Sequence, residues 1–155
     1  MNLIDNRTRA IGEMALNGLE QRARAISANT VNVLTPNYQR KEVSFEESLQ
    51  GIIQRENEKE EMKLQNSRMF QQNPQELLKS QTPAQIAFLN TQYQEGFAID
   101  VEIDTTEADG MDGNNVNLEA EMMDEAKNGM QYQVVASLLS KSYAMMNTII
   151  KGQNQ

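Results

Sequence analysis

Residues 118–152 read LEAEMMDEAKNGMQYQVVASLLSKSYAMMNTIIKG, and this stretch decides the fold. Mostly apolar residues recur in it at alternating spacings of four and three, which predicts one continuous seam along an α-helix. Asn117 is suited to cap the start of this helix, and Gly152 is suited to end it. The seam consists of Leu118, Met122, Glu125, Gly129, Tyr132, Ala136, Leu139, Tyr143, Met146 and Ile150.

The beginning of the chain has the same pattern from Asp5 to Val33. Asp5 is a suitable N-cap, and Pro36 disfavours helical geometry at Thr35, so the helix is expected to end there. A helix of about 29 residues is about 43 Å long. Its seam consists of Gly12, Leu16, Leu19, Ala23, Ile26, Thr30 and Val33.

The middle of the chain shows shorter and weaker patterns. Ser44 and Glu47 have the spacing of a capping box, which predicts that a helix begins there. Residues 55–61 are almost all charged, which is typical of the solvated face of a helix. Thr82 precedes a proline and predicts a short helix, whereas apolar and polar residues alternate over 97–103 as in a strand or extended arm.

The predicted fold is therefore mainly α. Residues 1–35 and 116–155 are expected to form an antiparallel, coiled-coil-like pair of long helices that together make one discontinuous domain. Residues 36–115 are expected to form an irregular middle region with short helices and an extended arm.

The C-terminal helix carries more apolar surface than one partner helix covers. Its seam is flanked on both sides by Met123, Ala126, Met130, Val135, Leu138, Met145 and Ile149. This wide arc predicts that sister chains complete the burial. The chain has 10 Met residues, which suit an adaptable packing surface and suit an ordinary core equally well.

The composition excludes several classes of function. The chain has no Cys and no His, so thiol chemistry, Cys-based zinc sites and the commonest general base are absent. A net charge of −8 without a basic stripe argues against nucleic-acid binding. The acidic stretch from Asp100 fails the EF-hand template, because Thr105 stands where Gly is required and Met111 where the last acidic ligand belongs. No catalytic residues, metal, cofactor or small-molecule substrate are predicted.

The first residues lack the apolar core of a secretory signal, and no stretch approaches the length of a membrane span. The chain is expected to be soluble, and either to stay in the cytoplasm or to leave it by a route without signal cleavage.

Two motifs resemble those of the flagellar basal-body rod protein family. The N-terminal signature of rod and hook proteins reads A-N-N-I-A-N followed by T-P-G-Y, and the chain is similar to it at Ala28, Asn29, Asn32, Val33, Thr35, Pro36 and Tyr38, preceded by Ala15, Leu16, Arg22 and Ile26. The run Asp112, Gly113, Asn114, Asn115, Val116, Asn117 and Leu118 resembles the C-terminal signature of the proximal rod members.

The chain departs from the family signature at a few positions. Thr30 and Val31 replace the usual Ile-Ala, and Leu34 replaces a common Asn. Asn37 replaces the Gly of T-P-G-Y, and because Asn tolerates positive φ better than most residues, a left-handed turn is still expected there.

The resemblance implies a structural subunit of the proximal rod that polymerises through its terminal helices into a tubular drive shaft in the periplasm. It further implies export by the flagellar type III apparatus without a signal peptide. The implied partners are other copies of the chain, other rod subunits, the adaptor FliE, and the export gate and MS ring. A soluble helical adaptor or an export chaperone is the alternative.

The residues expected to pack between subunits are Leu16, Leu19, Ala23, Ile26, Val33, Met122, Tyr132, Ala136, Leu139, Tyr143, Met146 and Ile150. Leu139→Asp is accordingly expected to block assembly and motility.

Overall fold

A computed structural model describes residues 6–73, 75, 81–90, 97–105 and 112–152. Its order of elements is α1 (Asn6–Val31), β1 (Lys41–Ser44), α2 (Glu46–Gln72), α4 (Pro83–Asn90), β2 (Asp100–Ile103) and α5 (Leu118–Gly152). The predicted fold class is confirmed: the protein is mainly α, with long helices at both ends of the chain.

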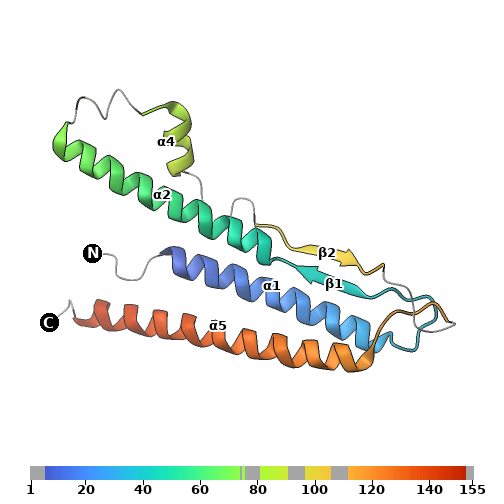
Figure 1. The fold of residues 1–155 in the computed structure, drawn as a ribbon. Helices are drawn as coiled ribbons and strands as arrows, with labels where there is room; N and C mark the ends of the chain where they lie inside the picture. Colours follow the sequence, from blue (N-terminus) through green and yellow to red (C-terminus); the bar gives the residue numbers. More distant parts are fainter. Residues whose placement is uncertain (1–5, 74, 76–80, 91–96, 106–111, 153–155) are drawn as a thin grey trace.

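α1 lies at the centre of the molecule, with α5 along one side and the β1–α2 segment along the other (Figure 1). α5 runs antiparallel to α1, so α1 begins and α5 ends at the same end of the molecule. α1 therefore buries two faces, one more than the single seam that its sequence pattern predicts.

The predicted ends of the terminal helices agree with the structure where it describes them. Ala120 N donates to Asn117 Oδ1 at 3.0 Å, so Asn117 caps α5 as expected. α1 ends at Val31, two residues before the end of its predicted seam at Val33 and four before Thr35. Asn37 has φ 59°, so the left-handed turn expected at this position is present. Asp5, the predicted cap of α1, lies outside the described residues.

The middle of the chain contains one long helix where short ones are expected. α2 has 27 residues, and the capping box predicted to start it is wrong. Ser44 is the last residue of β1, and Phe45 occupies the N-cap position without a side-chain cap bond. Thr82 and Gln85 do cap each other's backbone at the start of α4, which confirms the short helix predicted there.

The charged run on α2 is only partly solvated. Lys59 Nζ donates to Glu56 Oε1 at 2.6 Å, and both side chains are buried. Phe88 of α4 lies with its ring centroid 5.7 Å from Lys59 Nζ, a favourable cation–π distance. The prediction of a wholly solvated face is therefore wrong at these two positions.

β1 and β2 form an antiparallel pair in which Val43 lies opposite Val101 and Lys41 lies opposite Ile103. β2 falls within the predicted extended stretch 97–103. The core beside this ribbon is small, and it consists of Leu19, Ala25, Val43 and Phe45 with Leu49, Phe97, Ile99 and Val135 at its margin.

Candidate assembly site

The two sequence motifs meet at the end of the molecule where α1 ends and α5 begins. Asn114 donates through Nδ2 to the carbonyl oxygens of Asn32, Val33 and Thr35, at 2.9, 3.1 and 2.9 Å. These carbonyls belong to the turn that follows α1, and those of Asn32 and Thr35 also accept from the backbone N–H groups of Thr35 and Tyr38. A side chain some 80 residues downstream in sequence thus holds the turn that follows the N-terminal helix.

The turn after α1 lies against the same motif. Asn37 N donates to Asp112 O at 2.8 Å, and Gly113 has φ 73°. This positive φ favours glycine, and a Cβ at position 113 would lie 2.8 Å from Asn37 Oδ1, so the Asn37 side chain would have to shift. Asn115 accepts from Arg40 N and donates to Asp104 O, which ties the motif to both strands.

Asn114→Ala is expected to lower the free energy of unfolding by about 1–2 kcal/mol, because three carbonyl groups of the turn after α1 each lose the hydrogen bond from the Asn114 side chain. Urea unfolding of the full chain, followed by circular dichroism, measures the effect. Asn117→Ala removes a single cap bond and provides a weaker comparison, at about 1 kcal/mol. An Asn114 variant as stable as the native chain would show that these side-chain hydrogen bonds do not stabilise the turn.

Asn29, the first Asn of the N-terminal motif, is completely buried between α1, β1 and α5. Its Oδ1 accepts from Lys41 N at 2.9 Å and its Nδ2 donates to Lys41 O at 2.8 Å. The amide side chain thus forms the pair of hydrogen bonds that the backbone of an adjacent strand would form. Tyr38 donates its hydroxyl proton to Asn29 Oδ1 at 3.3 Å, and Asn29 Nδ2 also reaches Glu121 Oε2 at 3.2 Å.

Arg40 and Glu121 form the charged part of this junction. Glu121 is 0% exposed, and its Oε1 accepts from Arg40 Nε at 2.5 Å. Arg40 also pairs with Asp124 at 3.0 Å and with Asp104 at 3.4 Å. Burial by itself lowers the pKa of Arg40, but the hydrogen bond and negative charge of Glu121 outweigh it, and the net shift of the pKa is upward. Arg40 therefore stays charged.

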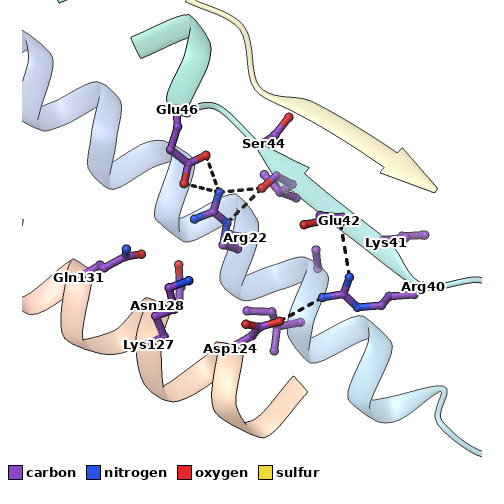
Figure 2. A pocket seen from close by; sticks show the side chains of 13 residues that line it. Arg22, Arg40, Lys41, Glu42, Ser44, Glu46, Asp124, Lys127, Asn128 and Gln131 are labelled. Carbon is purple, nitrogen blue, oxygen red and sulfur yellow. Dashed lines mark hydrogen bonds and ion pairs between the residues drawn. The ribbon is translucent and has the colours of Figure 1, made fainter. Parts of the chain in front are cut away.

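Arg22 fastens the other end of β1 to α1 (Figure 2). It donates twice to Val43 O, at 3.0 and 2.8 Å, and pairs with Glu46 at 2.7 Å, while its guanidinium lies 4.7 Å from the centroid of the Phe45 ring. Burial raises the pKa of Glu46, but the hydrogen bonds from Arg22 and the backbone lower this pKa by more than burial raises it. The net shift of the pKa is downward.

A groove of about 280 Å³ opens between β1 and α5, with α1 as its floor. Arg22, Asp124 and Lys127 are among the residues that line it (Figure 2). Among these side chains, Arg22, Arg40, Asp124 and Asn128 are already held by ion pairs or hydrogen bonds within the chain, as in a structural contact between elements.

The residues predicted to pack between subunits divide into three groups. Those buried within this chain are Leu19, Ile26 and Leu139, and those half-buried are Leu16, Val33, Ala136 and Met146. Those exposed are Ala23, Met122, Tyr132 and Tyr143. The side chain of Ile150 lies outside the described residues.

Two of the predicted residues contact α1 through polar or charged groups. Tyr143 donates to Glu13 Oε1 at 2.8 Å and carries Arg9 over its ring at 5.6 Å, and Arg9 Nη1 lies 3.8 Å from Met146 Sδ. The hydrogen bond to Glu13 is the main cause that raises the pKa of the Tyr143 hydroxyl.

Sequence reasoning missed the polar half of the seam between α1 and α5. Glu121 and Asn128 face α1 in place of Met122 and Gly129, and Asn128 Nδ2 donates to Leu19 O at 3.0 Å. Glu121 and Asn128 are seven residues apart, which is the spacing of a helix seam. A search for apolar residues alone does not find them. On α1 the missed buried residues are Met14, Ala15, Gly18 and Ala25.

The opposite side of α5 carries a second regular stripe that the rest of the described chain leaves exposed. Spacings of four and three place its members on one face of the helix. We call it the outer stripe, and it consists of Met123, Lys127, Met130, Val134, Leu138, Lys141 and Met145. Four of these residues were expected to widen the apolar arc of the helix, whereas Val135 lies half-buried at the margin of the core.

Over the described residues, no group of acidic side chains is arranged to hold a metal ion. No described helix combines the length and apolar character needed to cross a membrane.

Comparison with known proteins agrees with the two motifs. No family model matches the chain. The flagellar basal body rod protein FlgB of Escherichia coli is 28% identical over 139 residues, which cover 89% of each chain. FlgB of Borreliella burgdorferi is 26% identical over 136 residues, which cover 88% of this chain and 90% of the relative. The similarity therefore extends along nearly the whole sequence, and the chain resembles the flagellar basal-body rod proteins, FlgB among them.

Proposed function

We propose that the chain is a structural subunit of the bacterial flagellar basal-body rod, in its proximal part, and that it polymerises through α1 and α5 into a tubular drive shaft. The observation that carries the proposal is the outer stripe of α5. A helix already paired with α1 leaves Met130, Leu138 and Met145 mostly exposed, which is costly for a chain that remains alone in water.

The organisation of the chain supports the same role. Residues 1–35 and 116–155 act as one discontinuous helical domain. Within the middle region 36–115, residues 36–53 and the arm 97–115 bridge to neighbouring subunits. The joint made by Asn29, Arg40, Glu121 and Asn114 holds both ends of the chain in one register. Such a joint suits a rigid wall element that transmits torque.

The relatives are named as basal body rod proteins, and by that likeness the chain acts in the basal body as a structural component without catalysis. Its partners are other copies of itself and other rod subunits, together with the adaptor FliE and the export gate and MS ring. It reaches the periplasm through the flagellar type III apparatus.

Leu138→Asp is expected to abolish motility while the chain keeps its native helical content. Leu138 is 59% exposed, so the charge affects only a surface that a partner would cover. Swimming in soft agar and electron microscopy of basal bodies measure the effect in cells that carry the variant as their single copy. Leu139→Asp is a poorer test, because Leu139 packs against Gly12 of α1 and a charge there disrupts the chain itself.

Ser140→Asp is the matched control, since Ser140 is exposed on the same helix but lies away from the outer stripe. It is expected to leave motility unchanged. Motile cells with normal rods carrying Leu138→Asp would contradict the proposal. Recovery of the native chain only in the soluble fraction, never with purified basal bodies, would favour the adaptor or chaperone alternative.

A further inference from the structure

The ribbon of β1 and β2 has two edges, and the chain covers the edge that belongs to β1. β1 lies next to α1, and β2 lies on the outer side of β1 (Figure 1). On the edge of β1, Asn29 binds the N–H and the C=O of Lys41, and Arg22 donates twice to the carbonyl of Val43. These backbone groups of β1 therefore point towards α1 and away from β2.

The strand register shows which backbone groups of β2 point outward. In an antiparallel ribbon, pairs of residues that exchange hydrogen bonds alternate with pairs that do not. Lys41 and Val43 lie opposite Ile103 and Val101, so these two pairs do not exchange hydrogen bonds. Val101 and Ile103 thus direct their N–H and C=O groups away from β1.

A second observation agrees with this alternation. Asp104 N donates to Arg40 O at 2.8 Å, and this pair lies one step beyond Lys41 and Ile103 in the register. Over the described residues the sheet has two strands, and none of these residues makes a hydrogen bond to the backbone of Ile103 or Val101. Their side chains are 61% and 59% exposed. The outer edge of β2 is therefore open, and an open edge is a template for a further strand.

The two faces of β2 carry different side chains. Val101 and Ile103 share one face of the ribbon, and Asp100 and Glu102 lie exposed on the other. Glu102 lies directly opposite Glu42 of β1, and like charges in this position destabilise a strand pair. Within the described part of the chain, Asp100 and Glu102 take part in no ion pair. The acidic face of β2 is therefore left without a base.

These acids argue against a second β2 as the strand that covers the edge. Antiparallel pairing of two β2 edges places the residues of even number opposite one another, and these are Asp100, Glu102 and Asp104. Acids would then face acids along the whole contact. A strand with Lys or Arg at every second position pairs opposite charges on this face instead. Apolar residues at the positions between them cover Val101 and Ile103.

We propose that the outer edge of β2 binds an extended segment of a neighbouring subunit of a different protein, in which basic and apolar residues alternate. The segment adds an antiparallel third strand, and its backbone bonds to Val101 and Ile103. Lys41 lies on the apolar face, but it belongs to β1, and β2 separates it from the added strand. The inference rests on the proposed function for the presence of a neighbouring subunit, and it deepens that function by naming how the arm binds.

Two methylated peptides provide a matched test with the full native chain. A peptide of about seven residues that alternates Lys and Val is long enough to span β2. In the antiparallel arrangement its Val residues lie opposite Val101 and Ile103 and direct their N–H groups to β2, whereas its Lys N–H groups point away. Methylation of the Val backbone nitrogens is expected to weaken binding about tenfold or more relative to methylation of the Lys backbone nitrogens. Isothermal titration calorimetry measures both affinities.

A change in β2 itself tests the same contact from the other side. Val101→Pro removes an outward N–H and leaves the hydrogen bonds between β1 and β2 in place, as proline on an edge strand does. It is expected to weaken binding of the Lys-methylated peptide about tenfold. Val101→Thr keeps the N–H and the branched side chain, and it is expected to bind within about twofold of the native chain. Circular dichroism checks that both variants keep the native helical content.

The two methylated peptides have the same charge and composition, so attraction by charge and apolar contact alone does not distinguish them. Equal affinities, or tighter binding of the Val-methylated peptide, would overturn the proposal. A peptide of residues 98–105 that binds as tightly as the Lys-methylated one would show that a second β2 fits the edge, which also overturns it. A chain that binds none of the peptides overturns the docking of a strand, whereas the rod role is decided separately by the motility of cells carrying Leu138→Asp.

Discussion

Glu121→Ala is expected to lower the free energy of unfolding by about 3 kcal/mol, the largest effect of any single substitution considered for this chain. The carboxylate is completely buried, and it accepts from Arg40 Nε at 2.5 Å and from Asn29 Nδ2 at 3.2 Å. Its loss leaves a charged guanidinium and a buried amide short of a partner. Arg40 keeps Asp124 and Asp104, which holds the cost at the lower end of the range for broken buried pairs.

The measurement is urea unfolding of the full chain, with Glu125→Ala as the matched control. Glu125 lies one turn further along α5 with its side chain exposed, so its removal is expected to change stability by no more than about 0.5 kcal/mol. Equal losses for the two variants would mean that the joint between Arg40 and Glu121 contributes nothing specific.

The ends of the helices could be predicted because they depend on local chemistry. Pro36, Asn117 and Thr82 act through the backbone within a few residues of themselves, and the structure places helix ends beside all three. The positive φ of Asn37 follows from its side chain in the same way. The antiparallel pairing of the terminal helices followed from matching apolar patterns at the two ends of the chain.

The face of α5 that meets α1 could not be predicted in full. A sequence pattern ranks residues by hydrophobicity, and in the first half of α5 the buried side chains are Glu121 and Asn128. Distant groups hold them in place: Arg40 and Asn29 bind the Glu121 carboxylate, and the carbonyl of Leu19 accepts from the amide nitrogen of Asn128. None of these partners can be identified from the sequence of the helix itself, so an apolar pattern favours Met122 as the core residue.

The length of α2 could not be predicted from the sequence for a related reason. Its charged stretch contains Glu56 and Lys59, which are buried as a pair beside Phe88 from α4. Long-range contacts also displaced the expected capping box, because Phe45 packs into the core at the N-cap position and Arg22 pairs with Glu46. Tertiary packing outweighs local capping preference at this position.

Gly18→Ala is expected to lower the free energy of unfolding by about 2 kcal/mol, although alanine is the better helix former. A Cβ at position 18 would lie 2.5 Å from Cδ2 and 2.6 Å from Cδ1 of the Phe45 ring. The ring cannot retreat freely, because it is buried in the core beneath the guanidinium of Arg22. Gly51→Ala, in α2, meets nothing within 4 Å and is expected to raise stability by about 0.5–1 kcal/mol. Shifts of the same sign for both variants in thermal unfolding would show that α1 and Phe45 do not approach each other so closely.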